Sequence, residues 1–198
     1  VVIDGVGVCG CQLGRDRSSE EVVFQLQPLA GTPGLVDTPA GRRRVVVVGG
    51  PDDTEVTATV DMGAAGNGPD AHGLAVDLGG PTPGRHDTVD MGNPHLVIEV
   101  DDVDAVDLGV VGPTIEAFFE PEGCNVHLVQ VLDQATIRLR LWERGAGLTR
   151  ACGSGACAAA HLVHSWGLVD ERVEVRMAGG SAVVACAADG VCTVSVIW

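Results

Sequence analysis

The sequence predicts an α+β fold made mostly of antiparallel strands. Short runs of apolar and β-branched residues recur through the second half of the chain, separated by turns rich in glycine, proline and aspartate. Only two stretches show the apolar spacing of a helix. Hydrophobic residues make up 45% of the chain and aromatic residues only 3%, so we expect a core of valine, leucine, isoleucine and alanine.

The individual elements follow from these patterns. Strands are expected at residues 44–48, 55–60, 95–100, 126–132, 135–142, 173–177, 182–187 and 191–197. One helix is expected at residues 106–118, interrupted at Gly112-Pro113. A second is expected at residues 155–166, where Gly167 supplies the C-cap.

The region before residue 88 is organised less clearly. Residues 1–40 show no clean periodicity, apart from a short strand expected at residues 1–3. Residues 63–85 are rich in glycine, proline and aspartate and are expected to form a linker or long loop. The tetrapeptide Val-Asp-Met-Gly occurs on both sides of this segment, at residues 60–63 and 89–92, which suggests a local echo between related halves.

The charge balance argues against several classes of partner. The formal net charge is −15, whereas nucleic acids and anionic membranes are bound by basic surfaces. No apolar run reaches the length of a membrane span and no leader pattern opens the sequence, so we expect no membrane association. All 12 basic residues are arginines. Without a lysine, this chain cannot supply a Schiff base to a carbonyl substrate or to pyridoxal phosphate.

The cysteines are scattered along the chain. Their odd number and irregular spacing do not indicate a disulfide framework. We therefore expect thiols in a reducing cytoplasm, where cysteines are more often buried or catalytic than paired. The seven are Cys9, Cys11, Cys124, Cys152, Cys157, Cys186 and Cys192.

One segment combines a cysteine with the start of a helix. Cys152 is followed by Gly153 and Ser154, and Ser154 is expected to be the N-cap. The N–H groups of a first helical turn bind carboxylates, and glycine lets a ligand approach them closely. The same positive helix end favours a thiolate nearby. The segment could hold a substrate carboxylate beside a base, and a buried cysteine at a tight turn is the alternative.

Other polar residues lie at the ends of expected strands. Glu143 and Arg144 close one strand; an arginine can grip a carboxylate through two hydrogen bonds, and a glutamate can tune an acid–base pair. Asn93 and His95 lie in Gly-Asn-Pro-His, at a loop-to-strand junction where ligand contacts are common. Taken alone, His95 is more readily explained as a structural histidine.

Taken together, these segments resemble the diaminopimelate epimerase family. The order Gly-Asn-Pro-His, Trp-Glu-Arg-Gly, Ala-Cys-Gly-Ser-Gly-Ala-Cys is specific, and the resemblance extends over residues 42–198. It implies two pseudo-symmetric, mostly antiparallel α+β halves that close on a substrate. Residues 1–87 would be an incomplete N-terminal half plus a linker. Residues 88–198 would be the C-terminal half, whose last strand can return to the first half.

The resemblance implies interconversion of LL- and meso-diaminopimelate without a cofactor or metal, in lysine and cell-wall precursor biosynthesis. One thiolate removes the α-proton and an opposite thiol protonates the other face. Cys152 would be one of these thiols, and His95 and Glu143 would adjust the acid–base state of the pair. The implied substrate-binding residues are Asn93, Asn125, Glu143, Arg144, Gly153 and Ser154. The expected partner is a small amino-acid substrate, and a homodimer is left open.

The N-terminal region departs from the family pattern. The family carries its first thiol in Met-Cys-Gly-Asn-Gly, and the nearest fragment here is Cys9-Gly10, which Cys11 follows. Cys9 is therefore the one candidate for that thiol in a chain that looks truncated or altered at its N-terminus. His127 and Leu148 also replace glutamates that are usual in the family.

Three alternatives stay open. The first is another two-thiol enzyme of the same fold group, such as a proline-racemase-like or phenazine-pathway isomerase. The second is a catalytically impaired remnant that still folds. The third is a metal-binding module at Cys157, His161 and His164, which share one helix face.

Overall fold

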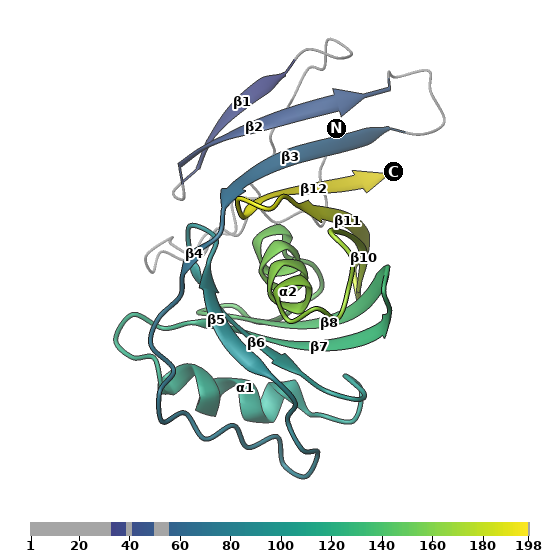
Figure 1. The fold of residues 1–198 in the computed structure, drawn as a ribbon. Coiled ribbons are helices and arrows are strands. Elements are labelled where there is room, and N and C mark those ends of the chain that lie inside the picture. The colour runs from purple at the N-terminus through teal and green to yellow at the C-terminus, as the bar shows by residue number, and fades with distance from the viewer. Residues whose placement is uncertain (1–32, 39–40, 50–55, 198) are drawn as a thin grey trace.

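The computed structural model describes residues 33–38, 41–49 and 56–197 (Figure 1). Within these residues one mixed sheet and two α-helices are present, which confirms the α+β class. The helices are α1 (Leu108–Ala117) and α2 (Gly153–Ser165). The strands are β1 (Gly34–Thr38), β2 (Gly41–Val48), β3 (Thr57–Ala64), β4 (Gly66–Asn67), β5 (His86–Asp90), β6 (Pro94–Glu99), β7 (Asn125–Asp133), β8 (Thr136–Glu143), β9 (Gly147–Thr149), β10 (Arg172–Met177), β11 (Gly180–Cys186) and β12 (Val191–Ile197).

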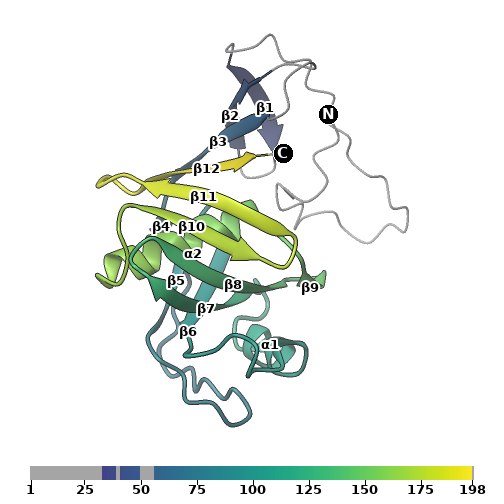
Figure 2. The same cartoon turned by 90° about the vertical axis from the view of Figure 1, so that its right-hand side faces the viewer.

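The sheet curls around α2, while α1 packs against its outer side (Figures 1 and 2). The strand order is β1-β2-β3-β12-β11-β10-β8-β7-β6-β5-β4, and β9 pairs with β8. Alternation along the strands separates two cores. Val97 and Ile137 belong to the hydrophobic cluster around α2, whereas Leu96 and Ile98 belong to the cluster beneath α1.

α2 consists mainly of small residues because it fills a nearly closed interior. The predicted apolar stripe of Ala156, Ala159, Ala160 and Val163 is buried as expected, but burial extends around the helix and also includes Ala158. The sequence predicted one apolar face, and the structure needs apolar residues on nearly every face. The helix ends at Ser165 with Trp166 as its C-cap, a role that we predicted for Gly167, and Gly167 follows with a positive φ of 75°.

Most of the predicted strands are confirmed, including the β2–β3 and β7–β8 hairpins. Two predictions are corrected. Residues 63–85 are not wholly a loop, because β3 continues to Ala64 and β4 pairs with β5. The expected strand at residues 1–3 lies outside the described residues.

The second correction concerns α1, which runs through Gly112-Pro113 without a break. Proline removes one helical hydrogen bond, but packing of a buried face can outweigh that loss. Val111 and Ile115 supply that buried face. Gly112 lets the helix approach the sheet, since a Cβ there would lie 2.7 Å from Cδ2 of Trp142.

The two Val-Asp-Met-Gly copies share a local hydrogen bond and a backbone feature. In each, the aspartate side chain accepts a hydrogen bond from the glycine N–H two residues on, at 2.9 Å for Gly63 and 2.6 Å for Gly92. Both glycines have positive φ, 81° and 92°. The methionines of both copies are buried in the cluster around α2. The sequence echo therefore corresponds to a structural echo between β3 and β5.

The last strand joins the first strands of the sheet to the C-terminal ones. β12 lies between β11 and β3 and pairs antiparallel with both. The sheet therefore runs without a break from the suggested N-terminal half to the suggested C-terminal half. The division into two halves between residues 87 and 88 stays a prediction. Neither helix of the described residues has the length and apolarity needed to cross a membrane.

The contact between α1 and β8 leads to a first prediction. Gly112→Ala should lower the free energy of unfolding by about 1–3 kcal/mol, because the new methyl overlaps the Trp142 ring. Urea unfolding measures the change. Val110→Ala is the matched control, since this side chain on the same helix is 67% exposed and should change stability by less than about 0.5 kcal/mol. A stabilised Gly112→Ala variant would contradict the packing.

Candidate active site

Strand topology brings several predicted site residues together where the ends of three neighbouring strands meet. β6 and β7 run parallel with His95 opposite Asn125, and β8 returns antiparallel with Trp142 opposite Val126. The beginnings of β6 and β7 and the end of β8 therefore lie side by side. The N-terminus of α2 packs against the same region, where Gly155 meets the side chain of His127.

Cys152 is the N-cap of α2, a role that we predicted for Ser154. Its backbone is extended, with φ −152° and ψ 117°, and its Sγ accepts a hydrogen bond from Gly155 N at 3.4 Å. Ser154 instead lies within the first turn, with its Oγ 3.5 Å from the same sulfur. The thiol is free and buried at 1% exposure. It therefore lies against the N–H groups of the helix start, which favour negative charge.

Two hydrogen bonds link Asn93 through His95 to His127, whose ring packs against the start of α2. Nε2 of His95 lies 3.0 Å from Oδ1 of Asn93, and its Nδ1 lies 2.8 Å from Nε2 of His127. The His127 ring touches α2 so closely that a Cβ on Gly155 would lie 2.9 Å from Nε2. Gly155 N in turn donates to the sulfur of Cys152. The predicted residues Asn93 and His95 are thus hydrogen-bonded in a chain with His127, and Cys152 lies at the helix start that the His127 ring contacts.

Both histidines are kept neutral by burial. Burial is the main reason that the pKa of His95 lies well below its ordinary value, and electrostatic repulsion from His127 and Arg144 lowers this pKa further. Burial also lowers the pKa of His127 to about 3. The amide oxygen of Asn93 can only accept a hydrogen bond, so neutral His95 carries its proton on Nε2. Its unprotonated Nδ1 then accepts a hydrogen bond from Nε2 of His127. Among the described residues, Nδ2 of Asn93 and Nδ1 of His127 are then left as a donor and an acceptor without partners.

Asn125 holds the backbone of Arg144 next to the Asn93–His95–His127 hydrogen-bond chain. Its Nδ2 donates to Pro94 O at 3.0 Å, and its Oδ1 accepts from Arg144 N at 3.0 Å. The guanidinium Nη1 of Arg144 donates to the carbonyl of Glu122. Arg144 also passes closely over Gly123, where a Cβ would lie 2.4 Å from its Cδ. Asn125 and Arg144 are therefore brought together as predicted from the family resemblance.

Glu143 lies at the end of β8 and is 7% exposed. Its Oε1 accepts a hydrogen bond from Thr149 Oγ1 at 2.5 Å, across the short β8–β9 pairing. The chain continues from β9 into the α2 start, so this bond fixes the segment that leads to Cys152. Thr149 therefore orients the Glu143 carboxylate from the strand that precedes Cys152.

Cys9 and Cys11 lie outside the described residues. Cys124 and Cys157 are free and buried, and burial raises the pKa of Cys124 to about 12 and that of Cys157 well above its ordinary value. Neither is suited to proton transfer near neutral pH. Cys152 is therefore the free cysteine of the described chain that the arrangement favours as an acid–base group.

The remaining cysteines correct a prediction. Cys186 and Cys192 form a disulfide across the β11–β12 hairpin, although the cysteine spacing did not indicate one. The two residues stand directly opposite in the register of the hairpin, which places their side chains together. The metal group suggested from helix spacing is also not assembled, because His161 meets Cys186 and Cys192 instead of Cys157 and His164.

Sequence reasoning missed His127, Thr149 and Gly155. His127 follows Asn125 by two positions on a strand, so the two side chains share one face. That signal was present in the sequence, but the partner His95 could be found only from the strand register. The closeness of Gly155 to His127 depends on tertiary packing and has no local signal.

Comparison with known proteins shows the family of the chain. The sequence model described as diaminopimelate epimerase matches residues 88–196, which is more than half of the chain. The chain belongs to the diaminopimelate epimerase family. A curated diaminopimelate epimerase from Bacteroides thetaiotaomicron is 39% identical over 185 residues, covering 91% of this chain and 66% of that protein. The chain thus spans slightly less than two thirds of this relative.

Solved structures show the same fold. A predicted epimerase from Pseudomonas aeruginosa is similar with a TM-score of 0.59 and 22% identity, covering 84% of this chain and 64% of that one. A hydroxyproline epimerase from Agrobacterium vitis, solved with trans-4-hydroxy-L-proline, is similar with a TM-score of 0.63 and 14% identity. The coverage in that case is 88% of this chain and 59% of that one.

The neutral histidine pair makes stability depend on pH. Unfolded histidines protonate below about pH 6.5, whereas folded His127 stays neutral down to about pH 3. The unfolded state binds more protons in this window, so stability is lost as the pH falls through it. His127→Gln should reduce the slope of unfolding free energy against pH between 4.5 and 6.5 by up to about 1.4 kcal/mol per unit.

Urea unfolding at several pH values measures that slope. His86→Gln is the control, because His86 is exposed at the start of β5 and should leave the slope nearly unchanged. An unchanged slope in His127→Gln would show that this histidine is not held neutral in the folded chain.

The close approach at Gly155 gives a third prediction. Gly155→Ala should destabilise the chain by about 1–3 kcal/mol, although alanine is the better helix former, because the methyl overlaps His127 and Leu141. Adding His127→Ala opens space, so the double variant should be more stable than the sum of the two single changes predicts. Strict additivity in denaturant unfolding would argue against the contact.

Proposed function

We propose that this chain carries the proton-transfer half-site of a cofactor-independent amino-acid epimerase acting on diaminopimelate. The observation that carries the proposal is Cys152 at the N-cap of α2, beside the first turn against which the hydrogen-bonded Asn93–His95–His127 chain packs. Family membership supports the reaction class. A place in lysine and cell-wall precursor biosynthesis, a cytoplasmic location and a homodimer belong to the same proposal.

The substrate carboxylate is expected at the first turn of α2. The N–H groups of that turn and the helix dipole favour an anion there, and Gly153 and Ser154 lie in it. Arg144 adds a positive charge from the end of β8. Abstraction of an α-proton places negative charge next to the carboxylate, so fixed donors at this position stabilise the charge as it develops.

Asn93 is suited to bind the polar end of the substrate. Its Oδ1 is occupied by His95, while its buried Nδ2 has no partner among the described residues. A buried donor without a partner is costly, and a substrate oxygen would satisfy it. The neutral His95–His127 pair holds the amide in this orientation, because His95 donates to Oδ1 and leaves Nδ2 directed elsewhere.

The proton balance requires two acid–base groups. Cys152 as a thiolate takes the α-proton, the C–H electron pair passes to the substrate carbanion, and a thiol on the other face returns a proton. One face alone can only take a proton and return it to the same side. Cys9 is the candidate in this chain for the second thiol, and it lies outside the described residues.

Proton exchange in deuterated water tests this proposal. If Cys152 is the only functional thiol, the chain should exchange the α-hydrogen of one diaminopimelate stereoisomer without inverting it. Inversion coupled to exchange would show a second base, and loss of inversion in Cys9→Ala would identify it. NMR follows the exchange and chiral chromatography follows the inversion, with proline as a comparison substrate for the related two-thiol enzymes.

Matched cysteine variants identify the base. Cys152→Ala should lower exchange by about 10²–10⁴-fold, the usual contribution of a positioned base. Cys157→Ala is the control, because this thiol is buried on the next turn of α2 and its raised pKa keeps it protonated. Absence of exchange in the folded wild-type chain would support the impaired remnant. Equal exchange in wild type and Cys152→Ala would exclude Cys152 as the base.

A further inference from the structure

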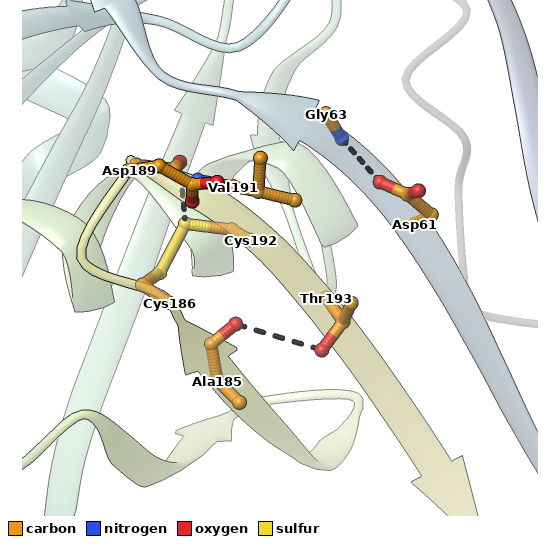
Figure 3. Close-up of a disulfide and its surroundings, with 9 residues drawn as sticks. Asp61, Gly63, Ala185, Cys186, Asp189, Val191, Cys192 and Thr193 are labelled. Carbon is orange, nitrogen blue, oxygen red and sulfur yellow. Dashed lines mark hydrogen bonds between the residues drawn. A yellow bond between two sulfur atoms is a disulfide. The ribbon is translucent and has the colours of Figure 1, made fainter.

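Three metal-ligating side chains meet where α2 packs against the β11–β12 hairpin. Cys186 and Cys192 are paired across the hairpin with Cα atoms 4.1 Å apart, and their sulfurs form the disulfide drawn in Figure 3. One nitrogen of the half-buried His161 imidazole and both sulfurs lie within 4.8 Å of one another. Within the described ranges, this is the one group of three or more His, Cys, Asp or Glu side chains close enough to share an ion.

The group is separate from the candidate active site. His161 follows Gly153 by eight residues on α2, which places the two about 12 Å apart along the helix axis. None of the three side chains takes part in the proposed proton transfer. Occupation of this group can therefore be measured independently of epimerase activity.

We propose that Cys186, Cys192 and His161 bind a zinc ion when the disulfide is reduced. Thiolates and imidazole are the ligands that Zn²⁺ prefers. The proposed cytoplasmic reaction supports the reduced form, since cytosolic thiol systems keep most disulfides open. In that compartment the hairpin presents two thiols beside an imidazole, and a zinc ion can occupy the place of the disulfide bond.

The geometry requires only small movements. Tetrahedral zinc with Zn–S of about 2.3 Å and Zn–N of about 2.0 Å spaces its donor atoms roughly 3.3–3.8 Å apart. The imidazole nitrogen already lies within 4.8 Å of both sulfurs, and the sulfurs can separate by side-chain rotation once the bond between them opens. Three protein ligands leave a fourth position for water, which can reach the ion from the side of the half-buried His161.

The charge balance also suits the buried location. Cys186 and Cys192 are 4% and 0% exposed, so a net charge at this position would be costly. Two thiolates, one neutral imidazole and Zn²⁺ sum to zero. The steps balance: a dithiol reductant gives two electrons and two protons to the disulfide and becomes a disulfide itself, and Zn²⁺ then displaces both protons.

Zinc titration of the full 198-residue chain tests the proposal. After anaerobic reduction and removal of the reductant, competition with a zinc indicator should show one tight site that the oxidised chain lacks. Co²⁺ in place of zinc should give a sulfur-to-metal charge-transfer band. Alkylation followed by peptide mass spectrometry should show zinc protecting Cys186 and Cys192, with no such protection of the other five cysteines.

Matched variants assign the ligands. The Cys186→Ser, Cys192→Ser double variant should lose the site, and His161→Ala should weaken zinc by more than the roughly 10–100-fold typical of an outer-shell change. His164→Ala is the control, because its Nδ1 is bonded to Val169 O at 3.0 Å and it lies outside the group. It should leave zinc affinity within about twofold.

Three outcomes would overturn the proposal. Equal zinc binding by the oxidised and reduced chains would place the ion elsewhere. A disulfide that resists reduction while the chain stays folded would make it a permanent structural bond. Zinc protection of other cysteines in the wild-type chain would also place the ion elsewhere. This result does not depend on whether the variants fold. None of these results bears on the exchange assay, so the zinc site and the proposed function are tested separately.

Discussion

The close packing of α2 inside the curled sheet is the constraint on which the rest of the structure depends. Ala156 and Ala160 are buried on one side of the helix and Ala158 is buried on the opposite side, so strands can approach the helix from more than one direction. Gly155 is a point of close approach, because even a methyl group there would overlap His127. This contact fastens the N-terminus of α2 to β7. A larger residue would move Cys152 away from the polar residues at the ends of β6, β7 and β8.

The same packing determines the chemistry at the helix start. Closing the sheet around α2 buries His95 and His127, and their loss of solvent keeps both neutral. Neutral rings can form a directed chain in which each nitrogen has one role, and this chain ends on the Asn93 amide. The family usually has a glutamate where His127 stands. A neutral imidazole therefore orients His95 here without adding a negative charge beside Cys152.

Local patterns in the sequence predicted most of the fold. The β7–β8 hairpin, the meander from β10 to β12 and the end of α2 near Gly167 follow from alternation and turn residues, which act over a few positions. Contacts between distant segments were not predictable in this way. The α1 helix continues through Pro113 because its buried face packs on the sheet. His127 joins the site because the parallel β6–β7 register places its strand beside His95.

The disulfide shows that cysteine pairing is predicted better from hairpin register than from cysteine spacing along the chain. Cys186 and Cys192 flank the turn at residues 188–190, and the register of the hairpin places them opposite each other. Judged by number and spacing along the whole chain, the cysteines indicated no pairing. Judged by hairpin register, two of them must touch. His161 adds the third member only because α2 packs against that hairpin, so one helix serves two separate groups. Its N-cap is the candidate thiol, and its third turn carries His161 beside the hairpin sulfurs.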